Sequence, residues 1–154
     1  MQDFVHLHVH TQYSLLDGQA SVARLVDKAM KNGMKGIAVT DHGNMFGIKE
    51  FTNYVNKKNS GPKGEVKDLK KRIAGIEAGT IECEDKEAEI AACKAKIVEA
   101  ENKLFKPIIG CEMYVARRTM DLKEGKPDQS GYHLIVLAKN ETGYHNLIKL
   151  VSHA

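Results

Sequence analysis

This 154-residue sequence lacks tryptophan and long apolar runs. Its longest uninterrupted apolar stretch is residues 134–138, far below the roughly 18 residues that a membrane span needs. Asp3 interrupts any cationic start of a secretion signal. We therefore expect no membrane segment, no export and a cytoplasmic location.

Cysteine is also scarce. Cys83, Cys93 and Cys111 are odd in number and too widely spaced for a disulfide framework or a CxxC zinc site. This usage fits a reducing compartment, in agreement with the expected cytoplasmic location.

A strong charge of one sign is missing as well. The chain has 23 basic and 20 acidic residues, and a net charge of +3 does not by itself indicate nucleic acid as a partner. The charges are concentrated, because residues 57–106 hold 12 basic and 10 acidic side chains. With 42% hydrophobic residues, the length predicts one globular domain, here interrupted by a highly charged segment.

The N-terminal segment alternates between apolar and polar residues. A strand has a side-chain period of two, so residues 4–10 are predicted to form a strand with its histidines on one face. The apolar face would carry Val5, Leu7 and Val9, and the opposite face His6, His8 and His10.

The next elements alternate between helix and strand. Ser21 caps a predicted helix that stops at Gly33, a short apolar strand follows at 36–40, and a second helix is predicted at 45–56. This order is typical of a parallel sheet covered by helices, so the predicted fold class is α/β.

Residues 60–105 have a different pattern. Two apolar seams with steps of three and four predict two antiparallel helices, which we interpret as a helical hairpin inserted into the α/β domain. The α/β pattern resumes with strands at 108–115 and 133–138 and a helix that begins at Asn140.

The histidine-rich segment carries the clearest chemistry. His8 and His10 lie two residues apart, about 6.6 Å along a strand, so both imidazoles can converge on one or two ions. A polar interior or a wet sheet face is the alternative. We expect His6, one pleat deeper, to be a buried histidine rather than a ligand.

Two acidic residues and a histidine come next. Asp17 follows the segment by a short loop, where it supplies an oxygen ligand or belongs to an Asp-Gly turn. Asp41 and His42 end the second strand, and sites in α/β folds gather at such C-terminal ends. Helix capping is the alternative for Asp41.

Two further candidates lie on the later strands. Glu112 is near the end of its strand and is suited to bridge two metals, unless it is an exposed edge residue. His133 begins its strand, so it reaches the same site only if that strand runs antiparallel to the strand of Glu112. We expect His145 and His153 to be solvated. Nucleotide-binding, zincin and nucleophile-elbow motifs are absent, which leaves metal-dependent hydrolysis.

Several segments carry a family resemblance. FVHLHVHTQYSLLDG at 4–18 and AVTDHGNMFG at 38–47 resemble the opening motifs of the polymerase and histidinol phosphatase (PHP) superfamily. KPIIGCEMYV at 106–115 and YHLIVLAKNETGYHNL at 132–147 are similar to the version of this domain at the N-terminus of the bacterial DNA polymerase III α-subunit family. The resemblance does not explain residues 60–105.

The resemblance implies a distorted (β/α)7 barrel, of which residues 1–154 would form the N-terminal part. It also implies two or three divalent metal ions, zinc or manganese, with magnesium as an alternative. The implied metal ligands are His8, His10, Asp17, His42, Glu112 and His133. We assign catalytic roles to Asp17, Asp41 and His42, with Asp41 orienting an imidazole.

The family completes its site with further ligands, including an Asp-x-His pair, that lie beyond residue 154. We therefore expect a truncated domain that is inactive alone and is marginally stable or self-associates through an unpaired sheet edge.

Three functions follow from the resemblance. The first is a metal-dependent phosphoesterase, a 3′–5′ proofreading exonuclease on single-stranded DNA 3′ ends, within a DNA-directed DNA polymerase (a nucleotidyltransferase) that replicates DNA with other replicase subunits. The second is a non-catalytic, metal-stabilised platform for that polymerase. The third is a free-standing phosphoesterase similar to histidinol phosphatase.

Overall fold

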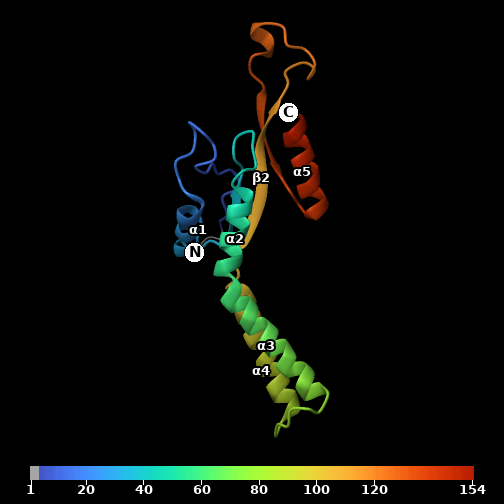
Figure 1. Ribbon diagram of the computed structural model, residues 1–154. Coiled ribbons are helices and arrows are strands. Elements are labelled where there is room, and N and C mark those ends of the chain that lie inside the picture. The colour runs from blue at the N-terminus through green and yellow to red at the C-terminus, as the bar shows by residue number, and fades with distance from the viewer. Residues whose placement is uncertain (1–3) are drawn as a thin grey trace. The chain divides into compact units, whose positions relative to one another are not determined.

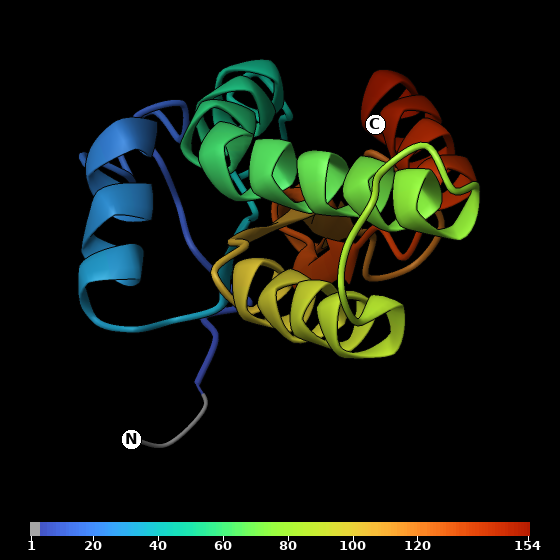
Figure 2. The same ribbon diagram turned by 90° about the horizontal axis from the view of Figure 1, so that it is seen from below.

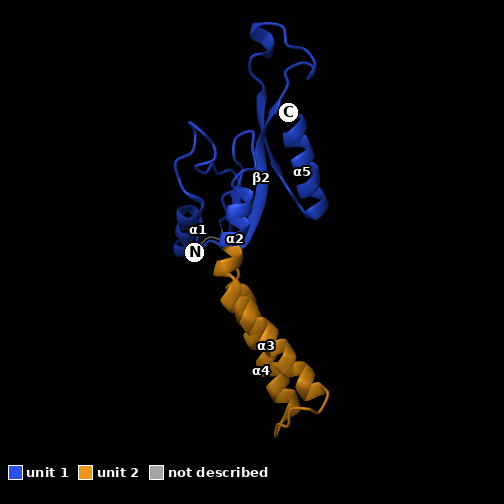
Figure 3. Cartoon of the chain, viewed as in Figure 1, with its two compact units in different colours: residues 1–54, 106–154 blue, residues 55–105 orange. Residues whose placement is uncertain are grey.

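The computed structural model describes residues 4–154, and the chain divides into two compact units (Figure 3). Unit 1 comprises Met1–Tyr54 and Lys106–Ala154, and unit 2 comprises Val55–Phe105. Among the described residues, no helix combines the length and apolar character needed to cross a bilayer.

Unit 1 is built on a mixed three-stranded sheet in the order β1-β2-β3. Strand β1 (Gly36–Val39) pairs in parallel with β2 (Lys106–Val115), and β3 (Tyr132–Leu137) pairs antiparallel with β2. The antiparallel return of β3 brings its first residues beside the last residues of β2. The predicted α/β class is confirmed, and the closed barrel remains a prediction.

The N-terminal segment is extended but is not the regular strand predicted at 4–10. Ala38 and Thr40, two residues apart along the chain, donate their N–H groups to the carbonyls of His6 and Val9, which are three apart. A regular parallel ladder would use carbonyls two apart. One extra residue is therefore accommodated at a bend, as in a β-bulge, and the alternation of faces is lost.

This bend overturns two expectations from the sequence. Leu7 is about half exposed instead of facing the core. His6 is exposed rather than buried, and its ring packs edge-on against Phe4 with centroids 4.7 Å apart.

The helices of unit 1 cover the sheet. Helix α1 (Val22–Lys31) contacts β1, and α5 (Glu141–His153) contacts β2, with the two helices on opposite sides of the strands (Figures 1 and 2). Ser21 accepts a hydrogen bond from the Arg24 N–H, which confirms the predicted cap. Leu147 of α5 is buried against the β2 residues Cys111 and Met113.

Helix α2 (Ile48–Lys58) begins three residues later than predicted. The side chain of Asn44 explains the difference. Its amide donates to the carbonyls of Tyr13 and His42, while its oxygen accepts from the Phe46 N–H, so residues 43–47 form a turn. An asparagine that bonds to nearby backbone groups competes in this way with helix formation.

Unit 2 contains α3 (Ser60–Glu77) and α4 (Lys86–Asn102), which pack against each other along a narrow apolar seam. The buried seam residues are Ile76, Cys93, Ile97 and Ala100. Both predicted helices are present, with Gly79 in the turn between them at φ +72°. The interpretation of 60–105 as an insertion into the domain remains a prediction.

Loop 116–131 connects β2 to β3 and contains a short 3-10 helix, η1 (Lys126–Asp128). The Arg118 guanidinium donates to Asp128 and lowers the pKa of that carboxyl.

Candidate metal centre

Glu112 is the centre of a polar cluster at the C-terminal end of β2. Its side chain is 6% exposed, and one carboxylate oxygen, Oε2, lies 2.9 Å from Nε2 of His8 and 2.5 Å from Nε2 of His10. The two imidazole nitrogens are 3.2 Å apart. Although the N-terminal segment is bent, it brings both histidines to the same carboxylate oxygen.

Asp17 joins the cluster from the loop that follows this segment. Its Oδ2 lies 2.7 Å from Nδ1 of His10 and 3.2 Å from Nδ1 of His42. His42 is held next to β2 by its backbone, because residues 42 and 112 form an isolated parallel bridge.

Asp41 lies at the end of β1, as predicted, and its carboxylate contacts the loop that carries Asp17. Its carboxylate is buried and accepts from the Thr11 N–H at 2.6 Å and from the hydroxyls of Thr11 and Ser14 at 2.8 and 2.7 Å. Within residues 4–154, the carboxylate bonds to these loop groups and not to an imidazole. The carboxylate therefore fixes the loop that carries Asp17, and its predicted role of orienting a histidine is not observed.

His133 reaches the cluster because its strand runs antiparallel to the strand of Glu112, as the sequence required. Because β3 returns antiparallel, His133 lies opposite Tyr114 in the register, and its Nδ1 contacts Oε1 of Glu112. The two oxygens of Glu112 thus face different histidines: Oε2 faces His8 and His10, and Oε1 faces His133.

The environment of Glu112 favours its ionised form. Burial by itself would raise the pKa of this carboxyl, but hydrogen bonds from His8, His133 and His10 outweigh that effect and lower the pKa to about 2. The cluster therefore holds a fixed negative charge at Glu112 across the ordinary pH range.

Both ring nitrogens of His10 face carboxylate oxygens. Nδ1 lies 2.7 Å from Oδ2 of Asp17, and Nε2 lies 2.5 Å from Oε2 of Glu112. Four imidazoles and two carboxylates form a donor set that suits zinc and related divalent ions.

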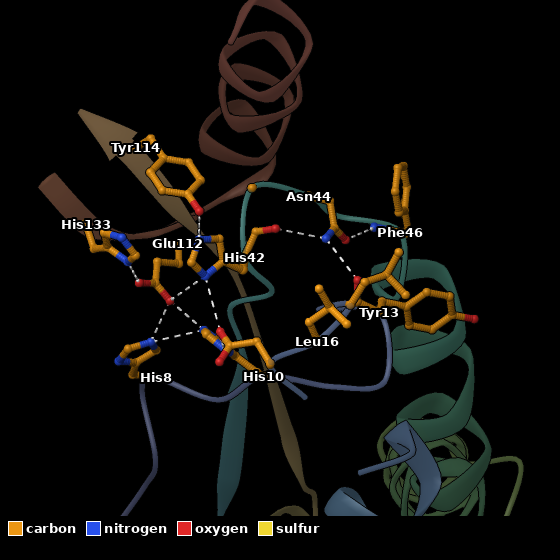
Figure 4. Close-up of a pocket in the computed structure, with 13 residues that line it drawn as sticks. His8, His10, Tyr13, Leu16, His42, Asn44, Phe46, Glu112, Tyr114 and His133 are labelled. Carbon is orange, nitrogen blue, oxygen red and sulfur yellow. Dashed lines mark hydrogen bonds and ion pairs between the residues drawn. The ribbon is translucent and has the colours of Figure 1, made fainter. Parts of the chain in front are cut away.

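The six residues implied as ligands are all brought together. Three sets each place their ligand atoms within 4.8 Å of one another, and they share members: His8, His10 and Glu112; His10, Asp17 and His42; His42, Glu112 and His133. Figure 4 shows Glu112 between the histidines. His145 and His153 lie outside these sets and are exposed, as predicted.

A pocket of about 800 Å³ opens over the cluster. Its rim carries three exposed apolar side chains, Leu15, Leu16 and Phe46. Leu16 has a φ of +69°, a left-handed conformation that is rare for leucine.

Tyr114 is a member of the site that the sequence reasoning missed. Its hydroxyl contacts Nε2 of His42, and its ring lies 4.7 Å from the His42 ring. A signal for it was present, because Tyr114 lies two residues after Glu112 and a strand places such residues on one face.

Comparisons with known proteins agree with this geometry. The chain is 40% identical to the DNA polymerase III subunit alpha of Treponema pallidum, over 98% of this chain and 9% of that protein. It is 41% identical to the same subunit of Borreliella burgdorferi (97% and 9%) and 35% identical to that of Mycobacterium tuberculosis (98% and 10%). The chain thus spans about a tenth of the length of these relatives. Residues 6–154 match the PHP domain, so this chain belongs to the PHP domain family.

Proposed function

We propose that this chain is part of the PHP domain of a DNA polymerase III α subunit and that its cluster binds divalent metal ions for phosphoester hydrolysis. The observation that carries the proposal is the convergence of four imidazoles and two carboxylates on one pocket. The similarity to replicative polymerase subunits supports DNA as the substrate and the other replicase subunits as partners.

The proposal is for two or three ions. It is supported by Glu112, whose two oxygens face separate histidines and would hold ions together with them. The set of His10, Asp17 and His42 offers a third position. The predominance of imidazole nitrogen favours zinc, with manganese as the next choice.

Divalent ions held here would supply an activated water near neutral pH and would stabilise negative charge on the phosphate oxygens. The side chains of the cluster supply a charged carboxylate and hold the other groups in position. Glu112 keeps its charge because its pKa is low, and Asp17 is held in place by the loop that Asp41 anchors. The imidazoles of His8, His10 and His133 surround the carboxylate and limit its movement.

The shape of the pocket supports a single-stranded 3′ end as substrate. The pocket is open, so a chain end can enter while the rest of the strand stays outside. The exposed apolar rim of Leu15, Leu16 and Phe46 offers surfaces against which unpaired bases can pack. We infer a 3′–5′ exonuclease that proofreads for the attached polymerase.

The test uses the full-length protein that contains this chain. After dialysis against a chelator, we expect trimming of 3′-labelled single-stranded DNA to be lost, and readdition of zinc or manganese to restore it. His10→Ala should reduce this trimming by at least 100-fold with an unchanged melting temperature, whereas His145→Ala, which changes an exposed histidine outside the cluster, should have no effect.

Other outcomes would contradict the exonuclease. Metal-free protein with unaltered nuclease activity would refute metal-dependent hydrolysis. If His10→Ala lowers the melting temperature and polymerisation while the unsubstituted protein trims no DNA, the metal-stabilised platform is supported instead. Hydrolysis of small phosphate monoesters without DNA trimming would favour the phosphatase.

A further inference from the structure

Tyr114 contacts one of the two ring nitrogens of His42. Its hydroxyl contacts Nε2, whereas Nδ1 of the same ring lies 3.2 Å from Oδ2 of Asp17 and 3.9 Å from Oε2 of Glu112. We propose that Tyr114 is a positioning residue that fixes the tautomer and the orientation of His42, so that the Nδ1 lone pair faces the cluster. This inference rests on the proposed metal binding.

Nδ1 of His42 must be without a proton to bind a metal, but its contact with Asp17 favours a proton there. A neutral imidazole carries one proton, and only the nitrogen without it can ligate a metal. Asp17 alone would attract the proton to Nδ1, since its carboxylate is an acceptor 3.2 Å away. That tautomer presents an N–H where a ligand lone pair is needed.

The Tyr114 hydroxyl acts against this preference when it accepts a hydrogen bond from His42. Its oxygen can accept the proton of Nε2–H, which leaves the lone pair on Nδ1. Histidines that bind metals commonly donate their second N–H to a neighbouring oxygen, and that contact sets both the tautomer and the direction of the ring.

The backbone holds the two side chains in register. Gly43 donates its N–H to the carbonyl of Glu112 at 2.9 Å, and Glu112 donates to the carbonyl of Asp41 at 3.1 Å, on either side of His42. Tyr114 lies two residues farther along β2, opposite His133 in the antiparallel register. The relative position of Tyr114 and His42 is therefore set by strand pairing rather than by the side chains alone.

Ring packing restricts His42 further. The Tyr114 ring lies 4.7 Å from the ring of His42 and 5.0 Å from that of His133, and the two imidazoles are 4.9 Å apart. Three rings in mutual contact leave His42 little freedom to rotate. Figure 4 shows the Tyr114 hydroxyl directed at His42.

The experiment removes only the hydroxyl. Tyr114→Phe keeps the ring, and Tyr132→Phe is the matched control, because Tyr132 is an exposed tyrosine of β3 outside the pocket. Cobalt(II) is titrated into each metal-free chain and followed by its visible absorption. We expect Tyr114→Phe to reduce the affinity for one bound cobalt ion by roughly 10–100-fold. Tyr132→Phe should bind cobalt with the affinity of the unsubstituted chain.

A second measurement uses the unsubstituted chain, so it does not depend on the folding of a variant. Nitrogen-15 NMR of the histidine rings in the metal-free chain should show the His42 proton on Nε2. A proton on Nδ1 would overturn the inference, as would cobalt titrations of a folded Tyr114→Phe chain that superimpose on those of the control.

Failure of this inference differs from failure of the proposed function. If the unsubstituted chain binds neither cobalt nor zinc, the metal site itself is refuted, and the role of Tyr114 with it. If both ions bind but the tautomer or the affinity contradicts the expectation, only the role of Tyr114 is lost.

Discussion

At the scale of single residues, chemically identical groups have different tasks because their surroundings differ. Asp17 and Asp41 are both aspartates close to the cluster, but Asp17 is about half exposed and faces two imidazoles, whereas Asp41 is buried under two hydroxyls and a backbone N–H. A buried carboxylate needs several donors, and the loop residues Thr11 and Ser14 supply them. Asp41 thus acts on the cluster through the loop it anchors.

A glycine in that loop gives a test of the arrangement. A Cβ at Gly18 would lie 2.1 Å from the carbonyl oxygen of Thr11, which is a backbone atom and cannot swing away. Gly18→Ala should therefore shift the loop, displace the adjacent Asp17 and lower the free energy of unfolding by roughly 1–3 kcal/mol. Urea denaturation and cobalt titration of the variant measure the two effects.

The control is Gly61→Ala in α3, where an added Cβ meets no atom within 4 Å. That change should leave cobalt affinity unaltered and should stabilise the helix slightly, because alanine has the higher helix propensity. Equal cobalt affinity in Gly18→Ala and in the unsubstituted chain would show that the loop does not position Asp17.

At the scale of elements, hydrogen bonds to side chains decide where the regular structures start and end. Asn44 delays the start of α2, and Ser21 and Asn140 cap α1 and α5. In unit 2, Asn59 joins the two ends of the segment: its amide donates to the carbonyl of Phe105 at 2.8 Å and accepts from the Phe105 N–H at 2.9 Å.

Asn59→Ala should therefore destabilise unit 2. Asn59 is 5% exposed, so the change leaves one backbone donor and one backbone acceptor unpaired away from water. Such a loss costs about 2–4 kcal/mol for the two groups. The measurement is loss of helical circular dichroism with urea, compared with Asn53→Ala, an exposed position of α2 where little change is expected. Identical urea midpoints for the two variants would contradict this role.

At the scale of the whole molecule, the candidate metal centre lies within unit 1. The residues that line the pocket come from 8–46 and 112–133, all of which belong to unit 1. The β3 residues Tyr132 and Leu134 are more than half exposed. These side chains are consistent with the expected self-association, which remains a prediction.

Deletion of residues 60–104 tests the independence of the site. Because Asn59 and Phe105 are joined by two hydrogen bonds, a short glycine-serine linker can connect them without stretching the chain. We expect the shortened chain to bind cobalt with the affinity of the intact chain to within about twofold. Circular dichroism provides the control that the remainder is folded, and a folded product without cobalt binding would show that unit 2 supports the site.

The sequence by itself determined the local elements and indicated the six residues that meet in the cluster. The cap at Ser21, the stop at Gly33 and the two apolar seams each follow from interactions within a few residues of the chain, so periodicity was enough to predict them. The meeting of Glu112 and His133 could also be foreseen, since it depends only on the direction of one returning strand.

Tertiary structure decided the bend near Leu7, the partners of Asp41 and the contact between Tyr114 and His42. That last contact joins residues 72 positions apart. Its existence depends on the pairing of residue 42 with Glu112 and on the register of β2, neither of which a local pattern specifies. A shift of one residue in such a pairing turns every side chain to the other face, so the fine geometry of the site is fixed only when the strands have paired.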